Sequence, residues 1–352
     1  MSQRVLAAMS GGVDSSVAAA LMVEAGHDVV GVTMKMWSGP NGEAPTSGCC
    51  TVSDAEDARR VAAALGIPYY VVDYTDHFST GVIDHFVDGY LAGRTPNPCV
   101  ECNRQVKFSV LLEHARELDC DLVVTGHYAR ADRWEDRWRL RRGVDRDKDQ
   151  SYVLSMLGQE QLARVRFPIG EMTKSETRAR AAELGLRTAS KPESMDICFV
   201  RGGDYRSFLA EVAPEGFRPG RIVDEEGHPV GRHDGVVGFT VGQRRGLGVA
   251  VGEPRYVTAI DPTTATVTIG RRQSLDVGAV TIEGLSSVSG AELKSNLLAQ
   301  YRAHGEAVAV ELGGDRVTFR QPQKAVAPGQ TITFYRGDEV AGGAVIANTE
   351  AP

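Results

Sequence analysis

The pattern of hydrophobic and polar positions alternates between two periods along the first 130 residues. Short apolar runs predict strands at 4–9, 28–36, 68–74 and 121–129. Longer stretches with apolar residues every three or four positions predict helices at 16–26, 53–66 and 107–120. Strands that alternate with helices predict an α/β domain with a doubly wound parallel sheet, which binds its ligands at the carboxyl ends of the strands.

The pattern changes after about residue 205. From there to the end, short runs of alternating apolar residues are separated by Gly, Pro and Asp, which predicts an all-β region. The segment 193–209 lies between the two kinds of pattern and is predicted to join them.

A glycine loop, SGGVDSS at 10–16, follows the first predicted strand and precedes the first predicted helix. Glycines let backbone N–H groups approach a phosphate, and the helix N-terminus adds partial positive charge. The loop has neither the GxxxxGK[ST] nor the GxGxxG form. It resembles the pyrophosphate loop of the adenine nucleotide α-hydrolases, which implies ATP as substrate and Asp14 as a ligand for Mg²⁺; the alternative is a tight turn that only packs a helix onto a strand.

Composition limits the classes of protein that need to be considered. The chain has 352 residues, 42% of them hydrophobic, and a net charge of −7, which argues against a protein that coats nucleic acid but leaves room for local basic patches. Apolar runs are too short for a signal peptide or a membrane-spanning helix, so we expect a cytoplasmic protein that makes no membrane contact. Six cysteines without an export signal favour catalysis or metal binding over a disulfide scaffold.

Two of these cysteines, Cys99 and Cys102, form a CxxC pair within NPCVECN. An enzyme that adenylates its substrate needs a nucleophile to displace AMP, and cysteine is the most nucleophilic side chain near neutral pH. A zinc site is the alternative, although no second CxxC is present to complete it. Cys49, Cys50 and Cys120 are expected to be ordinary buried residues.

Several motifs together resemble those of the tRNA-specific 2-thiouridylases. They span residues 4–346 and read AMSGGVDSS, GRTPNPCVECNRQVKF, TGHYAR, KDQSYVL, ESMDICFV, GFTVGQRRGLGV and AVAPGQTITFYRGDEVAGGAVI. The resemblance implies a pyrophosphate-loop ATP-binding domain at 1–205, a small, mostly β central domain at 206–280 and a C-terminal β-barrel that contacts tRNA at 281–352. It implies an enzyme that replaces the C2 oxygen of the wobble uridine by sulfur.

The resemblance also implies a role for individual residues. Cys102 is implied as the nucleophile and Cys198 as the carrier of a persulfide, and the two close a disulfide during turnover. The implied ATP-binding residues are Ala8, Met9, Ser10, Gly11, Gly12, Val13, Asp14, Ser15, Met34 and Gly126. The implied contacts to the target base are Asn97, Pro98 and Cys99, and the implied contacts to tRNA are Lys148, Asp149, Gln150, Gln300 and Tyr301.

The carrier of the sulfur atom stays open at this point. An iron–sulfur cluster held by Cys99, Cys102 and Cys198 is an alternative carrier of sulfur. The implied partners are tRNAs of the Lys, Glu and Gln type and a cysteine desulfurase or a sulfur-relay protein. Other adenylating ligases share the glycine loop, but they use an amine nucleophile and have no need of the two cysteines; an RNA-binding module without catalysis needs neither the loop nor Asp14.

The most basic stretch of the chain, RWRLRRGVDR at 137–146, carries five arginines. Arginines bind phosphates, and the neighbouring Trp134 and Trp138 can stack on bases, so one hypothesis is an RNA-binding surface. The alternative is a β-hairpin whose charges face solvent. The loop GQRRGLG at 242–248 is a second basic segment, and His127 is a candidate general base or a packing residue.

Overall fold

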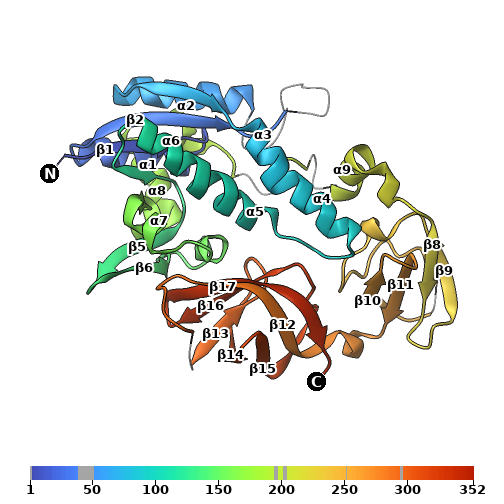
Figure 1. Ribbon diagram of the computed structural model, residues 1–352. Helices are drawn as coiled ribbons and strands as arrows, with labels where there is room; N and C mark the ends of the chain where they lie inside the picture. The colour runs from blue at the N-terminus through green and yellow to red at the C-terminus, as the bar shows by residue number, and fades with distance from the viewer. Residues whose placement is uncertain (1, 39–50, 194–196, 201–203, 251, 294–295) are drawn as a thin grey trace.

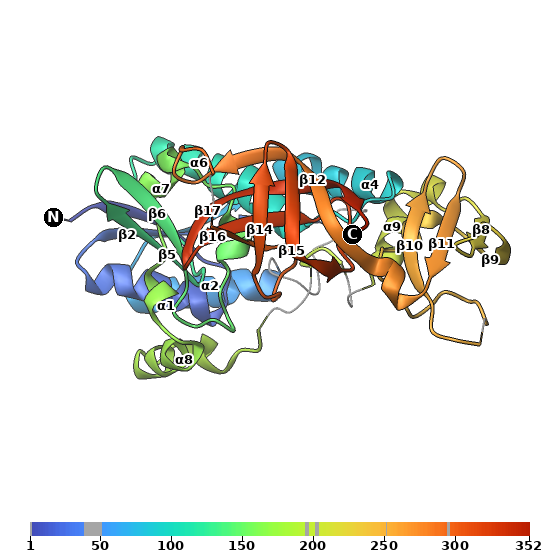
Figure 2. The ribbon, with the colours of Figure 1, turned by 90° about the horizontal axis from the view of Figure 1, so that it is seen from below.

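The computed structural model describes residues 2–38, 51–193, 197–200, 204–250, 252–293 and 296–352. Within these residues the chain forms three groups of strands (Figure 1). They are a parallel sheet near the N-terminus, a small sheet and a barrel near the C-terminus. Seen from below, the barrel lies between the other two (Figure 2). No helix among the described residues is both long enough and apolar enough to span a membrane.

The first sheet is parallel throughout and has the strand order β3-β2-β1-β4-β7. Its strands are β1 (Arg4–Ala8), β2 (Asp28–Lys35), β3 (Tyr69–Asp73), β4 (Leu122–Val124) and β7 (Val165–Arg166). Alternate residues of β1 face different cores: Val5 and Ala7 belong to one hydrophobic cluster, Leu6 and Ala8 to the other. The sheet is therefore covered on both faces, as the predicted doubly wound fold requires.

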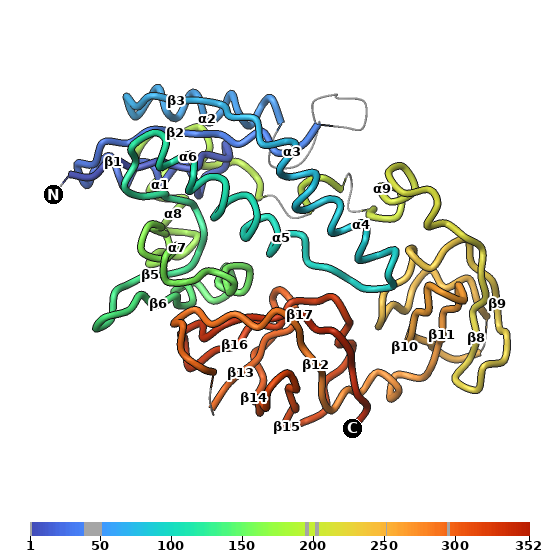
Figure 3. Tube along the Cα trace, in the orientation of Figure 1, coloured from blue at the N-terminus to red at the C-terminus, as the bar shows by residue number. Residues whose placement is uncertain are grey.

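Helices supply the two cores. One face of the sheet packs against α1 (Val13–Glu24), α2 (Val52–Leu65) and α8 (Lys174–Glu183). The other face packs against two helical stretches that run in opposite directions in Figure 3. The first stretch consists of α3 (Thr75–Phe78), the π-helical η1 (Ser79–Ile83) and α4 (Asp84–Leu91). The second consists of α5 (Pro98–Glu101), the π-helical η2 (Cys102–Val110) and α6 (Leu111–Glu117).

Two predicted boundaries are wrong. The helix expected at 107–120 begins at Pro98, because Asn97 caps it and proline fits the first helical position. The strand expected at 121–129 ends at Val124, and the chain then turns before β5 (Ala129–Trp134). Both errors arise where the regular hydrophobic period is interrupted.

The region after residue 205 is mostly β, as predicted, after the helix α9 (Tyr205–Val212). The small sheet has the order β10-β11-β8-β9, with β8 (Gly220–Val223), β9 (Pro229–His233), β10 (Tyr256–Asp261) and β11 (Thr266–Gly270). Stacked rings of Tyr90 and Tyr205, with centroids 4.8 Å apart, join α4 to α9.

The last strands close into a barrel in the order β12-β15-β14-β13-β16-β17, because β17 also pairs with β12. They are β12 (Asp276–Ser287), β13 (Leu297–Gln300), β14 (Val308–Gly313), β15 (Arg316–Lys324), β16 (Thr331–Arg336) and β17 (Glu339–Glu350). A hairpin of β5 and β6 (Arg137–Arg142) reaches out of the first region and pairs with β17 at Glu339. The fold class predicted from the sequence is therefore confirmed, whereas the domain boundaries at 205 and 280 stay predictions.

The remaining helical turns are short. In the first region they are α7 (Gln159–Arg164) and the 3₁₀ turns η3 (Ser151–Leu154), η4 (Pro168–Glu171) and η5 (Arg187–Ser190). Later in the chain they are η7 (Pro214–Gly216), η8 (Val236–Gly238) and η9 (Arg272–Leu275).

Candidate active site

The glycine loop between β1 and α1 packs so closely on two other segments that side chains do not fit. Gly11 has a φ of +72°, and a Cβ atom on it would lie 2.1 Å from the carbonyl oxygen of Asp54. A Cβ atom on Gly126, just after β4, would lie 2.6 Å from the backbone nitrogen of Ser15. Gly12 is the N-cap of α1 and brings no side chain to the first N–H groups of that helix. The loop thus presents backbone donors, which is the arrangement that binds phosphate.

A cavity of about 440 Å³ lies beside this loop, where the carboxyl ends of β1, β2 and β4 meet. Nine of the ten residues implied in ATP binding line it: Ala8, Met9, Ser10, Gly12, Val13, Asp14, Ser15, Met34 and Gly126. Gly11 is the tenth, and it is not among the lining residues. The cavity is therefore where the topology of a doubly wound sheet predicts a ligand.

Lysines from four distant parts of the chain converge on the cavity. They are Lys107 in η2, Lys148 before η3, Lys174 at the start of α8, and Lys191 after η5. A cluster of cations in a partly enclosed site attracts a polyanion such as a triphosphate. Lys148 is the one among these four that the sequence predicts as a site residue. The sequence does contain an indication that Lys174 has a role. A lysine in the first turn of a helix is unfavourable because its charge opposes the helix dipole, so a lysine there suggests that it binds a ligand or an acidic side chain.

Asp14 lies at the mouth of the loop and is held by two side chains. The Lys174 Nζ atom lies 2.9 Å and 2.8 Å from the two carboxylate oxygens, and the Tyr128 hydroxyl donates to one of them at 2.9 Å. Burial and the neighbouring carboxylate raise the pKa of Tyr128, so it remains a donor at neutral pH. A carboxylate beside a phosphate-binding loop fits Mg²⁺, but Lys174 must first leave Asp14.

Lys191 links the glycine loop to α2. Its Nζ atom donates to the carbonyl oxygen of Gly11 at 3.0 Å and to Asp54 and Asp57 at 2.7 Å each. Burial opposes the charge of Lys191, but the two carboxylates outweigh it and raise the pKa. Asp54 also completes a capping box with Thr51, the N-cap of α2. Lys191 therefore ties the loop to α2 as a cation.

Cys102 lies inside the continuous helical stretch from Pro98 to Glu117, at the first residue of its π-helical part. Asn97 accepts hydrogen bonds from the backbone N–H groups of Cys99 at 3.1 Å and Val100 at 3.4 Å, which sets the start of the helix. Wider π-helical turns often occur at functional sites because they shift side chains out of the regular α-helical register.

The Cys102 thiol contacts a residue that lines the cavity. Its sulfur is buried and lies 3.9 Å from the sulfur of Met36, which lines the cavity. Cys198 is partly buried and packs against the same hydrophobic cluster as Cys102. Phe199 beside it is buried, with ring centroids 5.2 Å from Phe86 and 5.8 Å from Phe78. The two cysteines are thus brought to one core, and a disulfide between them stays a prediction.

The remaining cysteines differ from this pair. Cys99 is exposed and lies one helical turn before Cys102. A zinc site needs at least three ligand atoms close together. Among the described residues, Asp224, Glu226 and His228 form such a group, with ligand atoms within 4.8 Å of one another. Cys99 and Cys102 belong to no such group among these residues. Burial raises the pKa of Cys120, as expected of an unreactive thiol. Cys49 and Cys50 lie outside the described residues.

The barrel supports the segment that leads into Asn97. The backbone N–H of Thr95 donates to the carbonyl oxygen of Pro328 at 2.8 Å, and the Gln330 side chain donates back to the carbonyl oxygen of Thr95 at 2.7 Å. A Cβ atom on Gly329 would lie 2.8 Å from the Thr95 nitrogen. The sequence APGQ at 327–330 is therefore a turn of the barrel that positions the predicted base-contacting residues.

The chain is similar to known proteins along almost its whole length. The chain matches family models described as tRNA methyl transferase HUP domain over residues 3–202, tRNA methyl transferase PRC-barrel domain over 206–271 and aminomethyltransferase beta-barrel domain over 279–346. It is 51% identical over 369 residues to tRNA-specific 2-thiouridylase MnmA of Roseiflexus sp. (strain RS-1), covering 98% of this chain and 99% of that protein.

Proteins with the same name from Chloroflexus aurantiacus (strain ATCC 29366 / DSM 635 / J-10-fl) and Mycolicibacterium smegmatis (strain ATCC 700084 / mc(2)155) are 51% and 52% identical. They match over 354 and 358 residues, which cover 98% and 97% of this chain and 99% of each relative. The chain belongs to the tRNA-specific 2-thiouridylase family. The resemblance found in the sequence is thereby confirmed, and with it an enzyme of the sulfurtransferase class whose first domain is of the ATP-binding HUP type.

Four of the five tRNA contacts implied for a 2-thiouridylase line two cavities of this chain. Lys148 and Gln150 line the cavity beside the glycine loop. Asp149 and Gln300 line a second cavity of about 660 Å³, between the 142–149 turn and the barrel. His304 lines both cavities, which are therefore neighbours.

Their side chains are already engaged with the protein. The Asp149 carboxylate accepts hydrogen bonds from the backbone N–H of Gly143 at 3.0 Å and of Ser151 at 3.1 Å. Gln300 is buried, and Tyr301 is buried with its hydroxyl 3.1 Å from Gln323. These three shape the surface in this structure, and their direct contact with tRNA stays a prediction.

The arginine-rich stretch of this 2-thiouridylase family member is the hairpin of β5 and β6, and its guanidinium groups are paired with carboxylates. Asp132 pairs with Arg139 at 2.8 Å and Arg141 at 2.9 Å, while Asp338 in the barrel pairs with Arg130 at 2.7 Å and Arg141 at 2.8 Å. Further partners are Glu339 for Arg137 and the ring of Tyr335 for Arg142. The stretch is thus a β-hairpin, as the alternative predicts, but these arginines bind groups of the protein instead of facing solvent; the RNA-binding surface stays a hypothesis.

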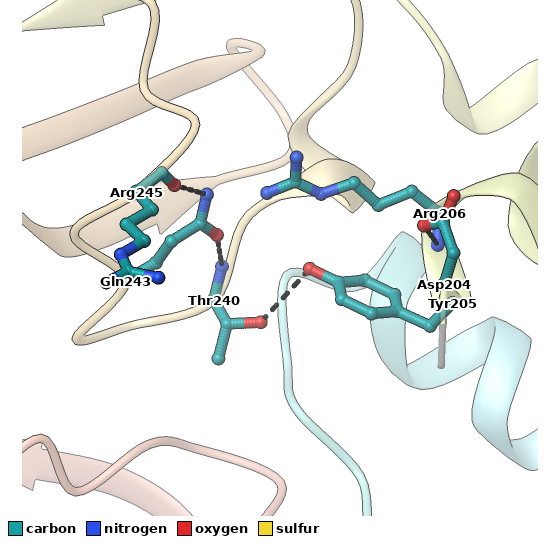
Figure 4. Close-up of a pocket in the computed structure, with 6 residues that line it drawn as sticks. All are labelled: Asp204, Tyr205, Arg206, Thr240, Gln243 and Arg245. Atoms are coloured by element: carbon teal, nitrogen blue, oxygen red, sulfur yellow. Dashed lines mark hydrogen bonds between the residues drawn. The ribbon is translucent and has the colours of Figure 1, made fainter. Parts of the chain in front are cut away.

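The second basic segment, 242–248, borders a hollow of about 400 Å³ lined by Asp204, Tyr205, Arg206, Thr240, Gln243 and Arg245 (Figure 4). Gln243 holds the loop, donating to the carbonyl oxygen of Arg245 at 2.9 Å and accepting from the backbone N–H of Thr240 at 3.2 Å. In Figure 4 the Arg206 guanidinium extends from α9 toward this loop. The segment therefore lines the junction between α9 and the small sheet.

His127 is a packing residue that also lines the cavity. Its ring is buried between Phe108 and Phe167, and its Nδ1 atom lies 2.6 Å from the Thr125 hydroxyl. Burial, with a smaller contribution from Lys107, lowers the pKa of His127 well below its usual value. A neutral imidazole donates or accepts hydrogen bonds here but carries no charge to ATP.

Proposed function

We propose that this protein is an ATP-dependent tRNA 2-thiouridylase. It adenylates the C2 oxygen of the wobble uridine and replaces that oxygen by sulfur from a persulfide on Cys198, producing 2-thiouridine, AMP and pyrophosphate. The observation that carries the proposal is one cavity that combines the glycine loop, four lysines and, behind Met36, the thiol of Cys102.

The first step needs a site that binds a triphosphate and leaves its α-phosphorus accessible. The C2 oxygen of the uridine attacks that phosphorus, and pyrophosphate leaves with the electron pair of the broken P–O bond. Backbone N–H groups at the start of α1 and the cations Lys148 and Lys174 stabilise the growing negative charge on the leaving group. Mg²⁺ bound at Asp14 would supply further charge neutralisation when present.

The second step transfers sulfur. The terminal sulfur of the Cys198 persulfide attacks C2, and AMP leaves with the former C2 oxygen. The Cys102 thiolate then attacks the Cys198 sulfur, which breaks the sulfur–sulfur bond, leaves the transferred sulfur on C2 and closes a Cys102–Cys198 disulfide. The transferred sulfur is reduced and the two thiols are oxidised, so an external thiol reductant must reopen the disulfide before the next cycle.

The wobble base has to leave the anticodon stack to reach the thiol. Asn97, Pro98 and Cys99 begin the helix that carries Cys102, so they are the segment best placed to contact an extruded uridine. The barrel turn at 327–330 fixes that segment, which supports a role for the barrel in tRNA binding. The substrates proposed are tRNAs of the Lys, Glu and Gln type, with sulfur delivered by a cysteine desulfurase or a relay protein.

The test is a thiolation assay on a tRNA transcript of the Lys type with ATP, Mg²⁺ and a cysteine desulfurase with cysteine as sulfur source. We expect 2-thiouridine in the digested nucleosides, measured by mass spectrometry, together with AMP. Cys198→Ala and Cys102→Ala should each reduce thiolation at least about 1,000-fold, because each removes a group that forms a covalent bond.

Cys120→Ala is the matched control. Cys120 is also buried, but it follows the C-terminal end of α6 and does not line the cavity. It should retain thiolation within about twofold. Full thiolation by Cys198→Ala would contradict the persulfide mechanism. Iron analysis and an absorbance spectrum after anaerobic purification separate that mechanism from the alternative, in which Cys99, Cys102 and Cys198 hold an iron–sulfur cluster: the alternative requires iron and loss of activity in Cys99→Ala.

A further inference from the structure

Lys107 belongs to the helical stretch that carries Cys102. The π-helical part η2 begins at Cys102, and at its end the backbone N–H of Leu111 donates to the carbonyl oxygen of Val106, five positions earlier. Hydrogen bonds in a π-helix join residues five positions apart, so side chains with this spacing lie almost above one another. In an α-helix, with about 3.6 residues per turn, they would point in different directions. The π-helical turns therefore bring Lys107, five positions after Cys102, to the side of the nucleophile.

The Lys107 side chain reaches the ATP cavity from this helix. It is partly buried and lines the cavity together with Met36 and His127. The Cys102 sulfur lies 3.9 Å from the Met36 sulfur. Burial lowers the pKa of His127, and the charge of Lys107 adds to this effect, so the ammonium and the buried ring are close in space. Lys107 thus lies in the part of the cavity that the nucleophile adjoins.

The other three lysines of the cavity are grouped around the glycine loop. Lys174 lies 2.8 Å from a carboxylate oxygen of Asp14 in the loop. The Glu193 carboxylate lies 2.8 Å from Lys148 and 3.4 Å from Lys174. Lys191 donates to the backbone of the loop. These three cations therefore lie around the site proposed for the leaving pyrophosphate.

The proposed reaction places the uridine and the pyrophosphate at different ends of the cavity. The attacking oxygen and the leaving pyrophosphate lie on opposite sides of the α-phosphorus, because the displacement is roughly in line. With the pyrophosphate at the glycine loop, the uridine lies on the other side, where Cys102 takes part in sulfur transfer. Lys107 comes from the helix of Cys102, so it is a cation on the side of the uridine.

We propose that Lys107 is a catalytic residue of the sulfur-transfer step, in which it stabilises AMP as the leaving group. Its ammonium binds the phosphate group that links the adenosine to the C2 oxygen of the uridine. This inference rests on the ATP-dependent reaction proposed above.

The reason is the charge that develops in each step. In the first step pyrophosphate leaves, and negative charge grows on its oxygens, beside the other three lysines. In the second step the persulfide sulfur bonds to C2, the C2–O bond breaks, and its electron pair stays on the oxygen that leaves with AMP. The phosphate group then changes from about one to about two negative charges. Lys107 therefore binds the departing AMP more strongly than the adenylated tRNA, which is the condition for catalysis.

The experiment follows a single turnover of the full-length enzyme. The enzyme is first charged with sulfur by a cysteine desulfurase with cysteine, and is then mixed with a tRNA transcript of the Lys type and MgATP. Quenched samples give pyrophosphate, AMP and adenylated tRNA, each traced by a radiolabelled phosphate of ATP. Lys107→Met should release pyrophosphate within about threefold of the wild-type rate but AMP about 100-fold more slowly, so adenylated tRNA should accumulate.

Further variants separate this role from a structural one. Lys107→Arg keeps a cation and should recover AMP release to within about tenfold of the wild type, whereas Lys107→Gln should behave as Lys107→Met. Lys174→Met should show the opposite pattern, with pyrophosphate release slowed about 100-fold and no accumulation of adenylated tRNA. Lys324→Met is the matched control, because Lys324 lies on the barrel and does not line the cavity, and it should follow the wild type in both steps.

Two results would overturn the proposal. They are equal slowing of both steps, or a normal rate of AMP release, in a Lys107→Met protein that keeps the melting temperature of the wild type. If the wild type itself releases no pyrophosphate with tRNA and MgATP, the ATP-dependent reaction is wrong and this inference fails with it.

Discussion

Two regions of this molecule gather positive charge, and they use it differently. Lysines at 107, 148, 174 and 191 come from distant parts of the chain and line one cavity beside a phosphate-binding loop. Arginines at 137, 139, 141 and 142 are close together in the sequence, and their guanidinium groups bind carboxylates and aromatic rings of the protein itself. The denser cluster in the sequence is thus the structural one.

The difference follows from the partners of each group. A planar guanidinium makes several directed hydrogen bonds, so Arg141 bridges Asp132 in the hairpin and Asp338 in the barrel and helps to join two regions. A lysine ammonium is a compact charge on a flexible stem, which can leave Asp14 or Glu193 for a phosphate. A high density of charged residues along the sequence therefore says little about ligand binding. Charged side chains that meet at the carboxyl ends of parallel strands are a better indication of a binding site.

The largest effect that would sharpen this comparison is expected from Lys174→Met. It removes the cation nearest to Asp14 at the site proposed for the leaving pyrophosphate, so AMP formation should fall about 100-fold or more. The apparent melting temperature should change little. Lys174 is the first residue of α8, and the capping box of Thr173 and Glu176 that stabilises the start of this helix is unchanged. Lys324→Met, on the outside of the barrel, serves as the control, and equal activity losses in the two variants would contradict the assignment.

A smaller effect is expected from Arg141→Met in the hairpin. Two carboxylates lose their shared partner, so the protein should be destabilised by about 1–3 kcal/mol, seen as a lower apparent melting temperature. Once folded, the variant should still form AMP at close to the normal rate. Arg133→Met, at an exposed position of the same hairpin, should change stability by less than about 0.5 kcal/mol. A large loss of tRNA affinity without a loss of stability would instead restore the RNA-surface hypothesis.

The smallest effect concerns pH. Arg141 and Arg130 lower the pKa of Asp338, and Arg139 and Arg141 lower that of Asp132 against the opposing effect of burial. Carboxylates with a lowered pKa stabilise the folded protein above their unfolded pKa of about 3.9, and this contribution is lost as the pH falls through the folded values. The difference in melting temperature between wild type and Arg141→Met should therefore be constant from pH 7 to 5 and shrink below about pH 4. A constant difference down to pH 3 would mean that these ion pairs contribute little.

Much of the site could be predicted from local sequence because the chemistry is local there. The glycine loop, its strand and its helix are contiguous, so ATP-binding residues from Ala8 to Ser15 follow from one motif, and nearly all of them line the cavity. The start of the helix at Pro98 was available as well, since asparagine followed by proline is a typical beginning of a helix. The hydrophobic period by itself predicts a later start, because the apolar positions become regular only later in the helix.

Other features depend on contacts between residues far apart in the chain, which no local pattern records. The hydrogen bonds of Thr95 with the barrel turn, the sulfur contact between Cys102 and Met36, and the ion pairs of Glu193 each join separate elements. Burial also has to be known before Tyr301 or Gln300 can be placed on a surface or in a core.

The sequence by itself determined the α/β and β regions, the phosphate-binding loop and the family, because periodicity and contiguous motifs encode them. Only the tertiary structure decided which charges are available for a ligand. The energy of an ion pair depends on the distance between its charges in space. An arginine or lysine therefore stabilises the fold or binds a ligand according to the carboxylates that folding places beside it.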